Sequence, residues 1–496
     1  MPIRKRTTRV AVLMGVSYLC LFASQAGRAA EPEIAEVIQQ AVAIVPNIRP
    51  DGMRERALQL TAVMQAKAGD ANGALLTIEG IRSQDRKWEA LASWAHARAQ
   101  KGDAEAALRI AASIGDAGLQ AEALADIAEA QAQEGDRRGL TGTIQLALRQ
   151  AAGIQRETAR NAALAAIAVI QAKTGDFEGA QRTTMEIKDV AVRAGVAGDI
   201  AEIQALAGDW SAVQTTLAIV QDREGRDRVL ATRIVPALAR RGVMETVTAA
   251  IDRIVGSFYQ ALALVRLAEL QTRDGRQHDA ELTFERIRHL TASLANEKDK
   301  DSQLLSIAPA QANAGDVPGA RQTVAQMKRE SLQLRALGLI AGILAGSGNV
   351  MGARDTAATI PEGPLRDNAR RLVSAAEAEE GNLARAREIT ASIRDDRLRA
   401  GSMVDIALAQ VKARDFHGAH EATLAIPVED ARLSSLIAVA RAQTRAGDTA
   451  GAVMWASTQS DPLHRWAVLM GIASGLLPPS ARCSTREEKR LTFVCG

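Results

Sequence analysis

Two stretches near the start of the chain share one pattern and decide the fold: LQLTAVMQAKAGDANGALLTIEGI at residues 58–81 and LASWAHARAQKGDAEAALRIAASI at residues 91–114. In both, an alanine-rich apolar segment leads into a Gly-Asp pair, and a second apolar segment follows. Apolar residues at 11, 8, 7 and about 4 positions before the glycine lie on one face of a helix. Glycine can adopt the left-handed backbone that ends this helix, and the aspartate can cap the next one. The pattern therefore predicts a hairpin of two helices, helix A before the glycine and helix B after it.

The hairpin recurs twelve times along the chain. The marker positions are Gly69, Gly102, Gly135, Gly175, Gly208, Gly242, Gly275, Gly315, Gly348, Gly381, Arg414 and Gly447, so the interval between markers is 33 apart from one of 34 and two of 40. We number the columns of the repeat from this marker, with negative numbers toward the N-terminus. A fixed period of this length is typical of a stacked solenoid, in which each hairpin buries its faces against its neighbours. The two intervals of 40 predict two helices that are longer by two turns, and Pro236 and Pro309 in column −6 are expected to bend their helices or shift where these start.

Four columns resemble the tetratricopeptide repeat (TPR): a small residue at −7, glycine at the marker, alanine at +5 and a large aliphatic residue at +12. The resemblance covers residues 31–477 and implies an all-α fold, a right-handed α-solenoid of about twelve stacked helix-turn-helix repeats. The chain departs from the family in its period of 33, in a missing late proline, and in glutamine at column −4, where the family has an aromatic residue. These glutamines are Gln65, Gln131, Gln171, Gln204, Gln271, Gln311, Gln410 and Gln443. HEAT-type or Sel1-like stacking remains an alternative.

The ends of the array are expected to act as caps. Residues 31–45 match a lone helix B, and residues 462–477 match a lone helix A, in which Leu469, Ile472 and Ala473 occupy the repeat columns. Terminal repeats of a solenoid are atypical because one of their faces meets water.

Residues 1–29 have the order of a secretory signal peptide. A basic start containing Arg4 and Arg9 precedes an uncharged apolar run at residues 10–23, and small residues follow that allow cleavage after Ala26 or Ala29. We expect export to the periplasm or the outside of the cell, with no integral membrane segment after cleavage, because the apolar run is too short to span a bilayer.

Removal of residues 1–29 changes the charge balance of the chain from +3 to about −2, with 56 basic residues against 58 acidic ones. A nearly neutral chain has no overall electrostatic attraction to nucleic acid, and we expect no nucleic-acid partner. The polar tail at residues 478–496 holds Cys483 and Cys495, which could form a disulfide in an oxidising compartment or remain free thiols.

Residue patterns for catalysis or cofactor binding are sparse, and we expect no enzyme activity, no cofactor and no metal site. The phosphate-binding GxxxxGK[ST], the GxSxG elbow, HExxH and CxxCH are all missing from the sequence. His417 and His420 stand at i and i+3 on one helix B, a spacing that could hold a metal ion, but two surface histidines are the simpler interpretation. An all-α carbohydrate-binding protein or glycan-active enzyme is the alternative, although the five tryptophans share no repeat column.

Candidate partner-binding residues lie on helices A, which line the concave groove in the family that the chain resembles; the exposed columns there are expected to be −13, −10, −6, −3 and −2. Column −2 is rich in basic residues, which could form a row for an acidic segment or a C-terminal carboxylate of a partner. They are Lys67, Lys173, Arg240, Arg273, Lys412 and Arg445. The simpler interpretation is that these cations offset the helix dipole.

A row of glycines on helix A of the ninth repeat adds to this candidate surface. Gly338, Gly342 and Gly346 follow each other at every fourth position. Interior glycines destabilise a helix by about 1 kcal/mol each relative to alanine, so the row indicates either a smooth floor for another backbone or a soft helix without a ligand. Taken together, the sequence predicts an exported, non-enzymatic scaffold that binds a peptide or protein in the groove of a helical-repeat solenoid.

Overall fold

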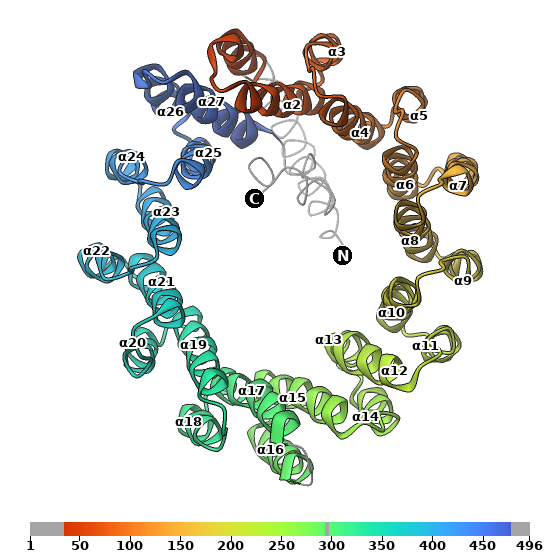
Figure 1. Ribbon diagram of the computed structural model, residues 1–496, viewed down its shortest axis with the longest axis vertical. Helices are drawn as coiled ribbons and strands as arrows, with labels where there is room; N and C mark the ends of the chain where they lie inside the picture. The colour runs from red at the N-terminus through yellow and green to blue at the C-terminus, as the bar shows by residue number, and fades with distance from the viewer. Residues whose placement is uncertain (1–33, 293–296, 478–496) are drawn as a thin grey trace, which may run out of the picture. The chain divides into compact units, whose positions relative to one another are not determined.

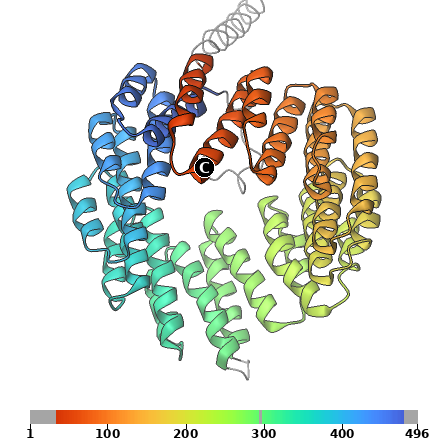
Figure 2. The same cartoon turned by 45° about the horizontal axis from the view of Figure 1, so that its top comes forward.

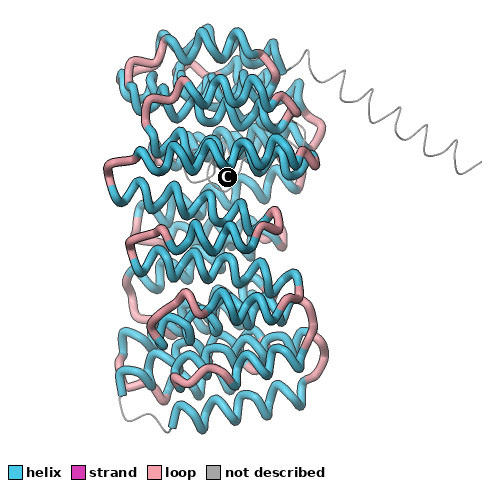
Figure 3. Tube along the Cα trace, turned by 90° about the vertical axis from the view of Figure 1, so that its right-hand side faces the viewer, coloured by secondary structure: helices cyan, strands magenta, loops and turns pink. Residues whose placement is uncertain are grey.

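The computed structural model describes residues 34–292 and 297–477, and within these residues every regular element is helical (Figure 3). The predicted all-α solenoid is confirmed: neighbouring helical hairpins stack one on the next along the chain (Figure 1). The chain divides into two compact bodies. We call residues 34–115 with 410–477 the terminal body, and residues 116–409 the central body.

The first two repeats of the terminal body are α2 (Asp51–Ala68) with α3 (Ala71–Glu79), and α4 (Gln84–Gln100) with α5 (Ala104–Ala112). A helix at residues 34–44 and the short η1 (Val45–Asn47) precede them. The later part of this body contains α24 (Phe416–Leu424), α25 (Glu429–Arg445), α26 (Thr449–Thr458) and α27 (Pro462–Leu476).

The central body begins with α6 (Ala117–Glu134), α7 (Arg137–Gly153), α8 (Glu157–Lys173), α9 (Phe177–Met185), α10 (Val190–Ala207) and α11 (Trp210–Leu217). Repeats 6 and 7 consist of α12 (Arg223–Val229), η2 (Leu230–Ile234), α13 (Val235–Arg240), α14 (Met244–Asp252), α15 (Ser257–Arg273) and α16 (Gln277–Ala292). The body ends with α17 (Glu297–Asn313), α18 (Val317–Ala325), α19 (Glu330–Gly346), α20 (Val350–Ala358), α21 (Pro364–Glu379) and α22 (Leu383–Ala391), and α23 (Asp396–Lys412) runs from it into the terminal body. Within the central body, helices A form one layer and helices B the other (Figures 1 and 2).

The hairpin tips have the predicted geometry. All eleven marker glycines have φ between 73° and 98°, and Arg414 takes the same left-handed region at φ 62°. The following Asp or Asn accepts a hydrogen bond from the backbone N–H three residues on in nine repeats, with distances of 2.8–3.1 Å. The glycine thus ends helix A and the acid caps helix B.

In column −4, where the family has an aromatic residue, the glutamine side chains form hydrogen bonds to helix B and to the acid that follows the marker. We call this set of hydrogen bonds the polar bracket. In repeat 4, Gln171 Oε1 accepts from Thr183 Oγ1 at 2.7 Å, while Gln171 Nε2 donates to Asp176 Oδ2 at 3.3 Å. Thr183 belongs to helix B, so the bracket ties helix A, the turn and helix B together. The same glutamine–threonine bond occurs at Gln65, Gln204, Gln271 and Gln311. Buried polar groups in proteins are normally hydrogen-bonded. These hydrogen bonds therefore allow glutamine to occupy the buried column −4 in a core that contains few aromatic residues.

The irregular spacings also have structural causes. The two longest intervals between markers contain α7 and α16, helices B of 17 and 16 residues where most others have nine, which confirms the predicted extra turns. The interval of 34 corresponds to the single π-helical turn η2, which absorbs one extra residue in helix A just before Pro236. Pro309 lies inside α17.

The prediction that the last helix is a cap with one face in water is wrong. In α27, every residue from Trp466 to Ser474 is buried, so the helix is covered on all sides. It packs against α25, where Gly471 and Gly475 allow the two backbones to approach closely, and against α2. There, Trp466 Nε1 donates a buried hydrogen bond of 3.0 Å to Thr61 Oγ1, which joins residues 405 positions apart. The terminal body therefore unites the first and last repeats.

The signal peptide at residues 1–29 and the tail with Cys483 and Cys495 lie outside the described residues. Among the helices that the structure does describe, none combines the length and the apolar character needed to cross a bilayer.

Candidate binding surface on helices A

The candidate surface for partner binding is the side of the helices A in the central body that faces away from helices B. We call it the A face (Figure 1). Its residues come from columns −13, −10, −9, −6 and −2, because these positions lie on the helix stripe opposite the buried columns −11, −8 and −7. The prediction that column −3 is exposed is wrong, because its residues are mostly buried in the central body.

The basic residues of column −2 fall in different surroundings. Lys173 and Arg240 are exposed on the A face, and each pairs with an acid in column −6 of the preceding repeat: Lys173 Nζ lies 2.6 Å from Glu129 Oε1, and Arg240 Nη2 lies 2.7 Å from Glu202 Oε1. Arg273 is exposed and lies 3.6 Å from its neighbour Asp274. Two of the three basic residues in the central body therefore form ion pairs between repeats, and the third lies beside an acid of its own repeat.

The remaining three basic residues belong to the terminal body. Lys412 and Arg445 are exposed, whereas Lys67 is only 4% exposed and so does not present its ammonium group to solvent. The sequence pattern alone suggested six equivalent cations. In the structure, Lys67 is buried, and the three cations of the central body each lie beside an acidic residue.

Further charges of the A face lie in columns −10 and −9. Arg233 pairs with Asp199 of the preceding repeat, and Arg371 Nη1 lies 2.6 Å from Asp405 Oδ2. Burial raises the pKa of Asp199, an effect that the nearby Arg233 opposes. Burial likewise raises the pKa of Asp405 against the opposing effect of Arg371. These two carboxylates thus form ion pairs with arginines of the same chain.

The three glycines of α19 have different surroundings. A Cβ on Gly338 or Gly346 would meet no other atom within 4 Å, whereas one on Gly342 would lie 2.8 Å from Leu372 Cδ1 of α21. The close approach at Gly342 is therefore filled by the chain's own next helix A. Gly338 is buried and Gly346 is exposed.

An apolar row lies beside these glycines. Leu305, Leu339 and Leu372 come from three successive helices A, and Leu339 is 45% exposed while the other two are half-buried. Leu305 stands in column −10, which is predicted from the sequence to be exposed, whereas Leu339 and Leu372 stand in column −9, which sequence reasoning did not consider. Most ion pairs of the A face thus lie in repeats 3–6, whereas repeats 8–10 carry the apolar row next to the Arg371–Asp405 pair.

One open hollow interrupts the charged part of the A face. It lies between α6 and α8, has a volume of about 260 Å³, and is lined by the Glu129–Lys173 pair together with Ile170 and Thr174. Its walls are two helices, and its two charged groups, Glu129 and Lys173, pair with each other.

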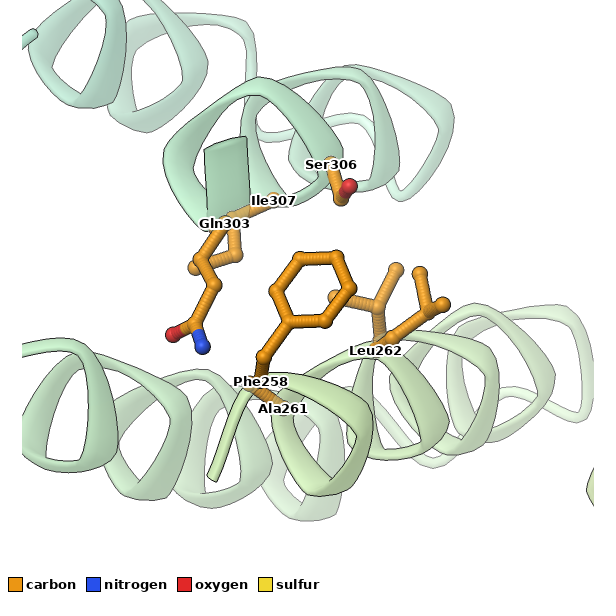
Figure 4. A pocket seen from close by; sticks show the side chains of 7 residues that line it. Phe258, Ala261, Leu262, Gln303, Ser306 and Ile307 are labelled. Atoms are coloured by element: carbon orange, nitrogen blue, oxygen red, sulfur yellow. The ribbon is translucent and has the colours of Figure 1, made fainter. Parts of the chain in front are cut away.

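A second, small pocket between α15 and α17 contains an unusual amide (Figure 4). Gln303 is 2% exposed, and neither its Nε2 nor its Oε1 has a hydrogen-bond partner. Phe258, Leu262 and Ile307 surround the space, which has no room for a water molecule. Column −12 holds alanine or serine in most repeats, so Gln303 places a polar group in an apolar position. Because the space is too small for a water molecule that could pair with the amide, we regard Gln303 as a packing defect.

The histidine pair of α24 does not form a shared site. His417 Nε2 lies 3.3 Å from Glu421 on the exposed side, while the His420 ring stacks on Trp455 with centroids 3.9 Å apart. His420 Nε2 is 2.7 Å from Gln443 Oε1, where the bracket threonine of other repeats would bond. Burial lowers the pKa of His420. No group of three or more metal-binding side chains occurs among the residues that the structure covers.

Comparison with known proteins adds little to this picture. No protein-family model matches the chain, and no curated protein matches it significantly. Among solved structures, Ton1535 from Thermococcus onnurineus NA1 is 16% identical, with 63% of this chain and 97% of that chain covered and a TM-score of 0.26. A circular tandem repeat protein with novel repeat topology and enhanced subunit contact surfaces is 15% identical, with 98% and 91% covered and a TM-score of 0.11. TM-scores this low carry no argument about the present chain.

Proposed function

We propose that the chain is an exported, non-enzymatic scaffold of tetratricopeptide-like repeats that binds a protein or peptide partner along the A face of its central body. The observation that carries the proposal is the apolar row of Leu305, Leu339 and Leu372, which lies on three successive helices A and leaves Leu339 nearly half exposed. Apolar side chains in regular succession on a helical-repeat surface suit a partner that contributes one apolar side chain per repeat.

From the charges on the A face we infer the net charge expected of the partner. Arg335 is exposed near this row, whereas the basic residues of repeats 4 and 6 already pair with Glu129 and Glu202. A strongly acidic partner would have to displace these acids from their cations. We therefore expect the partner to be a segment with apolar anchors and little net charge, which binds by burial of apolar area.

The test uses two exposed apolar residues of the same repeat. Leu339 lies on the A face, and Met351, which is 70% exposed, lies on helix B of repeat 9. The purified mature protein, its Leu339→Asp variant and its Met351→Asp variant are each used to capture proteins from the exported fraction. Circular dichroism checks that all three fold equally.

The proposal is supported if one defined protein binds the wild type and Met351→Asp but binds Leu339→Asp at least tenfold more weakly. Equal binding by both variants would contradict the apolar row as the docking surface. Turnover or retention of glycans that both variants share would instead favour the carbohydrate-binding alternative.

A further inference from the structure

The last helix of the described chain has the burial pattern of an internal repeat helix. Residues of α27 from Trp466 to Ser474 are buried without a break, which requires covering elements on every side. On one side the covering element is α25, and α2 packs on another side. A helix A inside a repeat array also needs its own helix B, and α27 is not followed by one among the described residues.

The N-terminal segment has the complementary pattern. In residues 34–48 the buried positions Ile34, Val37, Ile38, Ala41 and Val45 lie on one helical face, while residues 35, 36, 39 and 43 are exposed. This segment is a one-sided helix that lacks a preceding helix A.

The repeat register places both segments in the same unit. One period of 33 beyond Gly447 is position 480, and with that marker Leu469, Ile472 and Ala473 fall in columns −11, −8 and −7, where all three are fully buried. One period before Gly69 is position 36. With that marker, Ala41 occupies the small column +5 and Ile48 the aliphatic column +12, and both are buried.

Contacts in the terminal body bring the two segments together. The short η1, which continues the N-terminal helix, contacts both α27 and α2. The two views of the terminal body show the N-terminal helix, in red, beside α27 and α2 (Figures 1 and 2). The hydrogen bond from Trp466 to Thr61 holds α27 against α2 at the same place.

We propose that α27 and residues 34–48 are the helix A and the helix B of one thirteenth repeat, which is assembled from the two ends of the described chain. This split repeat serves as a joint: neither half can bury its apolar face alone, and each becomes stable only when the other is in place. The two segments should therefore open and close together as one cooperative unit.

Hydrogen exchange on the full mature chain tests this coupling. Ala41 is buried and Ala43, two residues later, is exposed, so Ala41→Glu and Ala43→Glu make the same chemical change on opposite faces of one helix. We expect Ala41→Glu to speed amide exchange at least tenfold both in residues 34–48 and in α27, and to leave α20 of the central body unchanged. Ala43→Glu should leave all three regions as in the wild type.

A substitution in α27 tests the same coupling from the other segment, so that the conclusion does not rest on Ala41→Glu alone. Leu469→Ala in α27 should speed exchange in residues 34–48, although the two positions lie at opposite ends of the described chain. If Ala41→Glu does not fold, Ala41→Ser and Ala43→Ser provide a milder matched pair. The split repeat is overturned if residues 34–48 lose protection while α27 keeps its own, or if the buried and exposed variants behave alike.

Discussion

Gln171 and Asp176 are joined by a hydrogen bond of 3.3 Å from Nε2 to Oδ2, and this bond passes directly over Gly179 in the first turn of helix B. A Cβ at Gly179 would lie 2.1 Å from Asp176 Oδ2 and 2.5 Å from Gln171 Nε2. The same glycine in column +4 accompanies this bond in repeats 1, 3, 4, 8, 11 and 12. In repeat 5 the column holds Ala212, and there Gln204 Nε2 has no partner. The glycine therefore makes room for the polar bracket.

Gly179→Ala should destabilise the protein, although alanine ordinarily stabilises a helix by about 1 kcal/mol relative to glycine. The added methyl group separates Gln171 from Asp176 and leaves a buried amide group without its partner, which costs about 1–3 kcal/mol. Urea unfolding followed by far-UV circular dichroism measures the change. Gly142→Ala is the matched control, because Gly142 is exposed in α7 and a Cβ there meets no atom within 4 Å. A gain in stability for both variants would show that the bracket contributes nothing.

Gln303→Leu should stabilise the protein by about 1–2 kcal/mol, because its amide is buried without a hydrogen-bond partner. A leucine of similar size would bring no unpaired polar atoms into the apolar space beside Phe258. The same substitution at Gln171, whose amide bonds to both Thr183 and Asp176, should be destabilising. Thermal unfolding of the two variants gives opposite signs if pairing decides the outcome, and equal signs would refute the argument.

Much of the fold could be predicted from the sequence because its local signals recur in register. The marker glycine, the capping acid and the apolar columns act within one hairpin, and their repetition made the irregular intervals at repeats 3, 6 and 7 interpretable. The glutamine column could be recognised but not explained from the family, because its partner threonine lies across the turn on helix B.

Contacts between repeats were harder to predict. The pairing of Lys173 with Glu129 depends on how far one helix A is displaced along the next, and the periodic sequence does not specify this distance. The contact between Trp466 and Thr61 joins the ends of the array, and each end carries only a normal half-repeat pattern. For these reasons the sequence could assign the candidate surface to helices A, while its charge balance and its apolar row became visible only in three dimensions.

Replacement of Arg414 by glycine should be more favourable than replacement by alanine, by about 1 kcal/mol, because glycine has no Cβ to oppose a left-handed backbone. Arg414 occupies the marker position with φ 62°, which lies in that left-handed region. Both variants lose the hydrogen bond from the Arg414 guanidinium to the carbonyl of Ala446, so the difference between them isolates the backbone. Urea unfolding of Arg414→Gly and Arg414→Ala measures this difference. Equal stability of the two would mean that the turn relaxes when the arginine is removed.

Acid should weaken the terminal body through His420. Burial between Trp455 and Gln443 lowers the pKa of this histidine below its ordinary value of 6.5, so the folded state keeps the ring neutral while the unfolded chain takes up a proton. The unfolded state then binds more protons, and stability falls as the pH drops below about 6.5. The hydrogen bond to Gln443 and the charge of Asp448 oppose this lowering of the His420 pKa, whereas the neighbouring His417 acts in the same direction as burial.

The free energy of unfolding of the wild type and of His420→Gln is measured between about pH 5 and pH 8. This range includes the ordinary histidine pKa of about 6.5. The stability advantage of the wild type over His420→Gln should be constant above pH 7 and should shrink in acid, because only the wild type has a buried ring that resists protonation. His417→Gln is the comparison variant: the His417 side chain is 87% exposed and makes only a smaller contribution to the His420 pKa than burial does, so this variant should change the pH dependence less than His420→Gln. A constant difference between wild type and His420→Gln across the whole range would show that the stacked ring titrates as it does in the unfolded chain.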